Sequence, residues 1–64
     1  MKLKMEIELD NAAFNEMGTF EVTRILKELA GRIEGNPHLS PGYSQPIMDI
    51  NGNTVGHMSV VDGD

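Results

Sequence analysis

Polar and apolar residues alternate strictly at the start of the chain, from Lys2 to Leu9. Because successive side chains of a β-strand point to opposite faces, this alternation predicts a strand with one apolar, buried face and one charged, exposed face. Asp10 and Asn11 favour turns through hydrogen bonds to nearby backbone, so we expect the strand to end there. Phe14 is expected to close the end of the core.

The hydrophobic period becomes helical between Phe20 and Glu34. Apolar residues recur there at intervals of three and four, forming a stripe of Val22, Ile25, Leu26, Leu29 and Ile33. Thr19 is a suitable N-cap, although the acidic partner of a capping box is absent. Gly35 is expected to end the helix in the left-handed conformation, and Pro37 should prevent its continuation.

Two features inside the predicted helix affect its stability. Arg24, Glu28 and Arg32 follow one another at intervals of four residues with alternating charge. Two ion pairs are therefore expected, each contributing about 0.2–0.5 kcal/mol. Gly31 costs about 1 kcal/mol relative to alanine. It either allows the helix to approach the sheet closely or marks an early end of the helix.

The remainder of the chain predicts a loop and two short strands. Residues 36–46 contain all three prolines and have no period, which predicts a loop. Residues 47–50 and 54–61 are predicted strands that pair antiparallel through a turn. The 64 residues then form a single two-layer α+β domain in the order β-α-β-β, a three-stranded sheet with one helix packed on one face. The strand order stays open, as does homodimerisation through the uncovered face or an edge strand.

The strongest turn signal lies between the last two strands, from Asp49 to Asn53. Two geometries fit. In the first, Asn51 and Gly52 form a two-residue type I′ loop. In the second, Asp49 opens a type I turn, Gly52 is left-handed, and the Asp49 carboxylate accepts a backbone N–H. We favour the second, because each residue type then stands where that turn prefers it. The predicted structural turn residues are Asp49, Asn51, Gly52 and Asn53.

The same segment begins like a calcium-binding EF-hand loop, since Asp49, Asn51 and Asn53 alternate. An EF-hand loop requires glycine at its sixth position and a bidentate glutamate at its twelfth. Thr54 and Val60 occupy those positions here. Calcium is therefore not expected, and no metal or other cofactor is predicted.

Charge and composition exclude several classes of function. Ten acidic and five basic residues give a net charge of −5, and the basic residues are scattered. Binding to nucleic-acid phosphates is therefore disfavoured. No apolar run has the length of a membrane span, and the N-terminus has no signal-peptide core. With no cysteine, the chain has no disulfide and no thiolate. We expect it to stay in the cytoplasm of the cell that makes it.

The isolated polar residues of the chain do not form a pattern that predicts a catalytic or metal-binding site. His57 is expected on the solvent face of the last strand, and His38 lies in the loop without a partner nearby in sequence. Glu6 and Glu8 share one strand face, but they alternate with lysines as a solvated face does. The serines have no acid–base group beside them. We predict that the protein is not an enzyme.

Three segments carry a resemblance to known proteins. They are residues 8–14 (ELDNAAF), residues 25–30 (ILKELA) with Arg32, Ile33 and Gly35, and residues 49–56 (DINGNTVG). In this pattern the chain resembles a group of very small proteins encoded by phages and prophages. Members of that group have no established function, so the resemblance implies a phage or mobile-element origin and transfers no catalytic or binding residue.

Two classes of function follow from these observations. The first is a small non-enzymatic module that binds a protein partner and modulates a host factor. It is motivated by small size, negative charge and an uncovered sheet face. The alternative is a nucleic-acid-binding module that uses that face, with Lys2, Lys4 and Tyr43.

Overall fold

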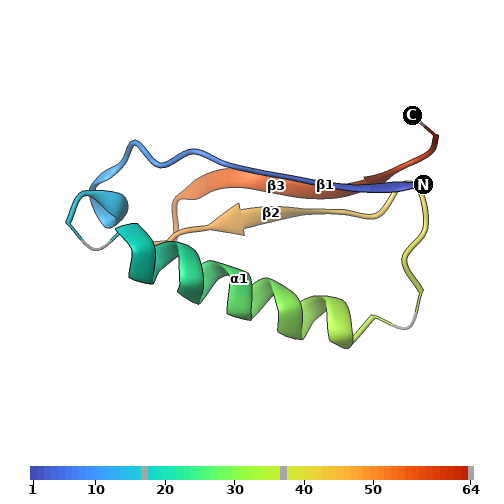
Figure 1. The fold of residues 1–64 in the computed structure, drawn as a ribbon, viewed down its shortest axis with the longest axis horizontal. Helices are drawn as coiled ribbons and strands as arrows, with labels where there is room; N and C mark the ends of the chain where they lie inside the picture. Colours follow the sequence, from blue (N-terminus) through green and yellow to red (C-terminus); the bar gives the residue numbers. More distant parts are fainter. Residues whose placement is uncertain (17, 37, 64) are drawn as a thin grey trace.

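A computed structural model describes residues 1–16, 18–36 and 38–63 of the chain. Its elements are, in order, β1 (Lys2–Ile7), the short 3₁₀ helix η1 (Ala12–Phe14), α1 (Gly18–Glu34), β2 (Ser44–Met48) and β3 (Thr54–Val61). The three strands form one antiparallel sheet, and α1 lies across one face of it (Figure 1). The predicted α+β fold, a three-stranded sheet with one helix on one face, is confirmed.

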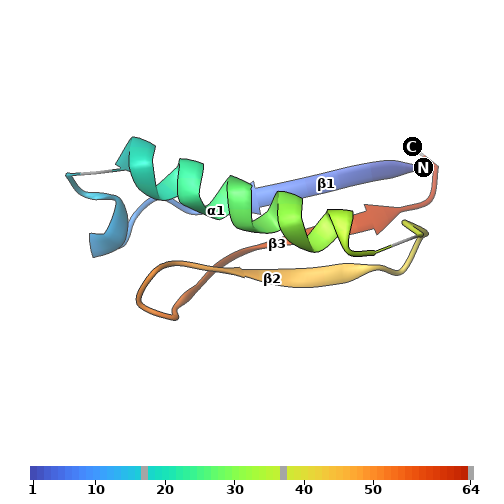
Figure 2. The ribbon, with the colours of Figure 1, turned by 90° about the horizontal axis from the view of Figure 1, so that it is seen from below.

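The last strand in sequence lies in the middle of the sheet. The strand order is β1-β3-β2, and β3 is antiparallel to both neighbours. Met58 of β3, for example, lies between Met5 of β1 and Gln45 of β2. The two outer strands are therefore parallel to each other and form the two edges of the sheet. Viewed from the helix side, α1 runs between them (Figure 2).

The core lies between α1, β2 and β3. The apolar stripe of the helix contributes Ile25 and Leu29, and Met58 at the centre of the sheet is fully buried. The whole cluster of buried apolar residues comprises Phe14, Ile25, Leu29, Ile47, Val55 and Met58. Phe14, delivered by η1, closes one end of this core as the sequence predicted.

The first strand is less covered than its alternation predicted. It ends at Ile7 rather than Leu9, and Leu3 and Met5 remain 48% and 39% exposed on the face meant to be buried. A helix is about 10 Å across and strands lie about 4.8 Å apart, so one helix covers about two strands. Here the covered strands are β2 and β3, which leaves the helix side of β1 partly open.

The predicted loop over residues 36–46 is wrong at its end, because β2 begins at Ser44. Val60 donates its N–H to the carbonyl of Tyr43. From Tyr43 onward, every second residue therefore directs its backbone N–H and C=O toward β3, and the residues between them direct theirs away from the sheet. Pro46 is one of the outward residues. Because its missing N–H would have had no partner in the sheet, an edge strand accepts proline there. The strand also ends at Met48, which places Asp49 and Ile50 in the turn.

The start of α1 also differs from the prediction. The helix starts at Gly18, so Thr19 lies inside its first turn and is not the N-cap. Its carbonyl accepts a hydrogen bond from the Thr23 hydroxyl at 2.8 Å. Met17, the preceding residue, lies outside the described residues.

Neither glycine near the end of α1 has the role expected of it. Gly35 is not left-handed; its N–H donates to Gly31 and that of Asn36 donates to Ile33, which closes the last turn. Gly31 is exposed, and a Cβ built on it meets no atom within 4 Å. It therefore marks neither a close approach to the sheet nor an early end of the helix. Pro37 lies outside the described residues.

Candidate functional site

The turn between β2 and β3 has the second of the two geometries. Asp49 accepts from the N–H of Gly52 at 3.0 Å and donates its own N–H to Asn53 at 2.9 Å. Gly52 has φ +84°, whereas Asn51, like every other described non-glycine residue, has a negative φ. A type I′ loop needs positive φ at both central residues, so this is a type I turn followed by a left-handed glycine.

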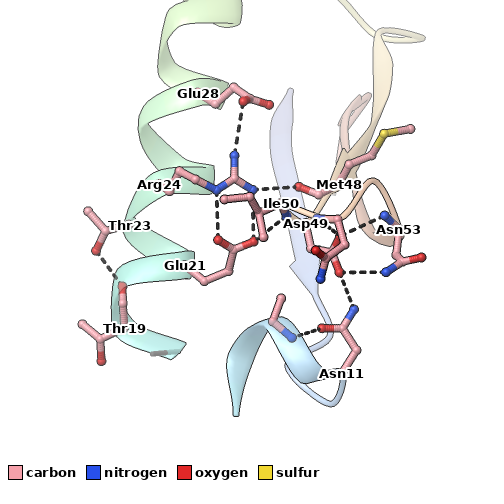
Figure 3. Close-up of polar contacts among 12 residues, drawn as sticks. Asn11, Thr19, Glu21, Thr23, Arg24, Glu28, Met48, Asp49, Ile50 and Asn53 are labelled. Atoms are coloured by element: carbon pink, nitrogen blue, oxygen red, sulfur yellow. Dashed lines mark hydrogen bonds and ion pairs between the residues drawn. The ribbon is translucent and has the colours of Figure 1, made fainter. Parts of the chain in front are cut away.

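The Asp49 carboxylate is buried and accepts four hydrogen bonds (Figure 3). One oxygen, Oδ1, accepts the backbone N–H groups of Asn51 and Asn53, each at 2.9 Å. The other, Oδ2, accepts the side-chain amides of Asn11 at 2.6 Å and Asn53 at 3.2 Å. Asn11 also accepts the Ala13 N–H, which caps η1. Asp49 thus holds together the hairpin turn and the segment that carries Phe14.

This hydrogen bonding determines what Asp49 can do chemically. Both carboxylate oxygens face N–H donors, the opposite of what a cation requires. Among the described residues, no group of three or more His, Asp or Glu side chains could hold a metal ion. The predicted turn residues therefore form a structural unit, with Asp49 at its centre.

A second polar cluster joins the hairpin to the helix. Glu21 is buried, and its carboxylate accepts two hydrogen bonds from Arg24, at 2.9 and 3.0 Å. The same carboxylate accepts the backbone N–H of Ile50 at 2.8 Å. Arg24 also reaches the Met48 carbonyl at 3.4 Å and Glu28 at 3.3 Å. We call the pair Glu21 and Arg24 the clamp, because it fixes α1 to the turn (Figure 3).

Sequence reasoning missed Glu21, because it lies outside the predicted apolar stripe of the helix. A signal was present, since Glu21, Ile25 and Leu29 are spaced four residues apart and lie along one line of the helix surface. The two predicted ion pairs, from Arg24 to Glu28 and from Arg32 to Glu28, are both present.

Both buried carboxyl groups are held ionised. The hydrogen bonds from Arg24 lower the pKa of Glu21 below its ordinary value and outweigh the opposing effect of burial. Burial raises the pKa of Asp49, but hydrogen bonds from Asn53, Asn11 and Asn51 outweigh it, so that pKa is also lowered. A general acid near neutral pH needs a raised carboxyl pKa, so neither group suits that role.

Two large apolar side chains stand exposed beside the clamp. Phe20, which precedes Glu21, is 69% exposed, and Ile50, whose amide Glu21 binds, is 67% exposed. Phe20 lies one helical turn before Arg24 and so shares its side of α1. We call Phe20 and Ile50 the corner. Met48 is also exposed, but its side chain points away from the helix (Figure 3).

The sheet face opposite α1 is polar and of mixed charge. It holds an open depression of about 440 Å³ lined by Lys4, Met5, Glu6, His57 and Ser59. Glu6 lies opposite His57, and both side chains are exposed. Tyr43, which the nucleic-acid hypothesis placed here, packs against the core and donates its hydroxyl to Gln45 at 2.8 Å. The lysines of this face therefore have no stacking aromatic beside them.

The other residues considered from the sequence, His38 and the serines, are not brought together into one site. His38 is exposed in the loop before β2, and its backbone N–H donates to Asn36. Ser44 and Ser59 lie opposite each other in the sheet.

No helix in the described part of the chain has both the length and the apolar character needed to cross a membrane. Comparison of the chain with protein-family models, curated proteins and solved structures gave no match.

Proposed function

We propose that this chain is a small non-enzymatic module of phage or prophage origin that binds a protein partner and thereby modulates a host factor. The observation that carries the proposal is the number of large apolar side chains left exposed. Among the residues that the structure describes, eight such side chains are 39–70% exposed, namely Met1, Leu3, Met5, Leu9, Phe20, Leu26, Met48 and Ile50. Single exposed apolar residues are ordinary, but clusters of them on ordered elements are typical of interaction surfaces.

The corner of Phe20 and Ile50 is the best candidate for the partner-binding surface. Aromatic side chains are enriched at the centres of protein interfaces. The clamp and the four hydrogen bonds to Asp49 fix the backbone on both sides of the corner. A surface that is already ordered before binding loses less conformational entropy when it binds. Ile50 in particular is two-thirds exposed and is not among the residues that pack against the core cluster.

Photo-crosslinking tests this assignment. A photoactivatable residue replaces Ile50 in the full chain, expressed in the cells that produce it, and a matched variant carries it at Asp62, which is exposed just beyond the end of β3 that lies away from the turn. We expect a discrete protein adduct from position 50 and none from position 62. Phe20→Ser, combined with the probe at position 50, should remove the adduct while the circular dichroism spectrum is unchanged.

Three outcomes would contradict the proposal. One is the same adducts from both probe positions, and another is no adduct from position 50. An adduct whose mass is that of two copies of the chain would also contradict it, since the corner would then be a self-association surface.

Binding to nucleic acid has less support. Lys2 and Lys4 share their face with Glu6, and the net charge of the chain is −5. Electrostatic attraction to phosphates, which dominates such binding, is correspondingly weak.

A further inference from the structure

The outer side of β1 is an unpaired strand edge. Glu8 donates its N–H to Val55 at 2.8 Å, and the register continues with Glu6 opposite His57. In an antiparallel pair, alternate residues direct both N–H and C=O toward the neighbouring strand. The even-numbered residues of β1 therefore bond to β3, and Leu3, Met5 and Ile7 direct their backbone groups outward.

The charges along β1 match those of a second copy of β1 that runs antiparallel to it. Going along the chain, Lys2 and Lys4 precede Glu6 and Glu8. If a second β1 lies antiparallel with Met5 opposite Met5, then Lys4 lies opposite Glu6 and Lys2 lies opposite Glu8. Each opposite-charge pair occurs twice because of the two-fold symmetry.

The backbone favours the same register. Opposing Met5 with Met5 also opposes Leu3 with Ile7, so the residues whose N–H and C=O groups point outward meet one another. The lysines and glutamates then occupy the positions between the hydrogen-bonded pairs. Side chains at those positions come closest together, with Cα atoms about 4.5 Å apart.

Other registers place like charges together. A slip of two residues in one direction sets Lys4 opposite Lys4, and a slip in the other direction sets Glu6 opposite Glu6. A slip of one residue opposes outward backbone groups with groups that already bond to β3. Charged residues on a strand edge usually prevent sheet pairing, and here they leave one register without repulsion.

The exposed apolar residues near this edge fit the same arrangement. Leu3 and Met5 lie on the helix side of β1, because they pair with the buried residues Val60 and Met58. Leu26, 44% exposed, lies on the flank of α1 opposite to the clamp. Since the clamp contacts the β2–β3 turn and α1 runs between β1 and β2 (Figure 2), Leu26 is on the β1 side.

We infer that the chain forms a homodimer in which the two β1 strands pair antiparallel about Met5. The two sheets become one, in the order β2-β3-β1-β1-β3-β2, with both helices on the same face. Leu3, Met5 and Leu26 of the two copies then lie side by side over the joined edge. This surface does not include Phe20 or Ile50, so the crosslinking test of the corner and the tests of the dimer give separate results.

Charge exchange tests the register on the full chain. Sedimentation equilibrium gives the dimer dissociation constant of the wild type, of Lys4→Glu, of Glu6→Lys and of the double exchange. Each single exchange turns two attractive pairs into repulsive ones and should weaken the dimer by about tenfold or more. The double exchange restores opposite charges and should return the constant to within about threefold of wild type. Lys27→Glu is the control that changes a charge elsewhere without effect.

Cysteine crosslinking gives a second measurement that does not depend on charge. Because the chain has no cysteine, Met5→Cys introduces a single thiol. Opposed residues at that position have Cα atoms about 5.5 Å apart, within the range of a disulfide. Oxidised Met5→Cys should form a covalent dimer, and Leu3→Cys should do so only when mixed with Ile7→Cys. A wild type that sediments as a monomer at all concentrations would overturn the inference. So would single charge exchanges that leave dimerisation unchanged, or Leu3→Cys that crosslinks to itself as readily as Met5→Cys.

Discussion

Asp49 is a residue whose effect reaches well beyond its own turn. Its carboxylate bonds to Asn51 and Asn53 within the hairpin and to Asn11, 38 residues earlier in the chain. Asn11 in turn caps the short helix that places Phe14 in the core. Removing any of the four donors weakens the stabilisation of this carboxylate. Removing the carboxylate leaves all of its donors without their acceptor.

Asp49→Ala should therefore be destabilising, because it removes the acceptor of four part-buried hydrogen bonds from Asn11, Asn51 and Asn53. Asp49→Asn should be less harmful, since it keeps one oxygen for the turn. Urea denaturation compares both with Asp62→Asn, an exposed acid after β3 that should have little effect. Equal midpoints for Asp49→Ala and the control would contradict this account of the turn.

Stability should fall in acid because of Glu21 and Asp49, whose pKa values are both lowered in the folded chain. Above the ordinary carboxyl range, both residues are ionised in the folded and unfolded chain, and their contribution is complete. As the pH falls below about 4, the unfolded chain takes up protons first, so unfolding is favoured until the folded pKa values are passed. Urea midpoints measured from pH 7 downward should show this loss, and Glu21→Gln should flatten it. The same slope in Glu21→Gln as in wild type would assign the acid sensitivity to other groups.

At the level of the elements, the sequence predicted what periodicity controls and missed what tertiary contacts control. The alternation before Asp10 and the stripe around Ile25 identified the strand and the helix. Pro46 was placed in the loop, so the start of β2 was missed. A proline fits a strand only where its nitrogen faces no neighbouring strand, and the sequence does not show which side of β2 is unpaired. Glu21 was missed for a similar reason, since its partner Ile50 comes from a distant turn. The exposure of β1 depends on which two of the three strands the single helix covers, and this is set by tertiary packing.

Gly56 shows how closely two of these elements approach. It lies opposite Ile7, and a Cβ built on it would collide with the Glu6 carbonyl oxygen. Gly56→Ala should therefore displace β1 and destabilise the fold by about 1–3 kcal/mol. Gly31→Ala is the matched control, because a Cβ there meets nothing and the helix should gain up to about 1 kcal/mol. Thermal denaturation of the two variants should shift in opposite directions, and a tolerated Gly56→Ala would mean that the β1–β3 contact is loose.

For the molecule as a whole, the small core and the uncovered β1 are connected. The six residues of the buried cluster come mainly from α1, β2 and β3, and β1 adds only a partly buried Ile7 to it. Domains of this size bury little apolar surface and are marginally stable on their own. A second copy that covers Leu3, Met5 and Leu26 would supply part of the missing burial.

If the dimer forms, the stability of the wild type should depend on its own concentration. Association with a folded copy favours the folded state, so the Tm should rise with protein concentration over the range that spans the dissociation constant. Lys4→Glu, whose dimer is weaker, should have a Tm that is lower and depends less on concentration over that range. Differential scanning calorimetry at several concentrations measures both. A wild-type Tm that is independent of concentration would show that β1 is stable without a second copy.

Pro46 has a consequence for how far such an assembly can grow. Once two β1 strands have paired, the strand edges left in the described part of each chain are those of β2. At the midpoint of β2 lies Pro46, whose backbone faces outward and has no N–H. A third copy has no continuous row of donors on which to align. Growth by a further strand would lose a hydrogen bond at each of these edges, so we expect the inferred assembly to stop at two copies.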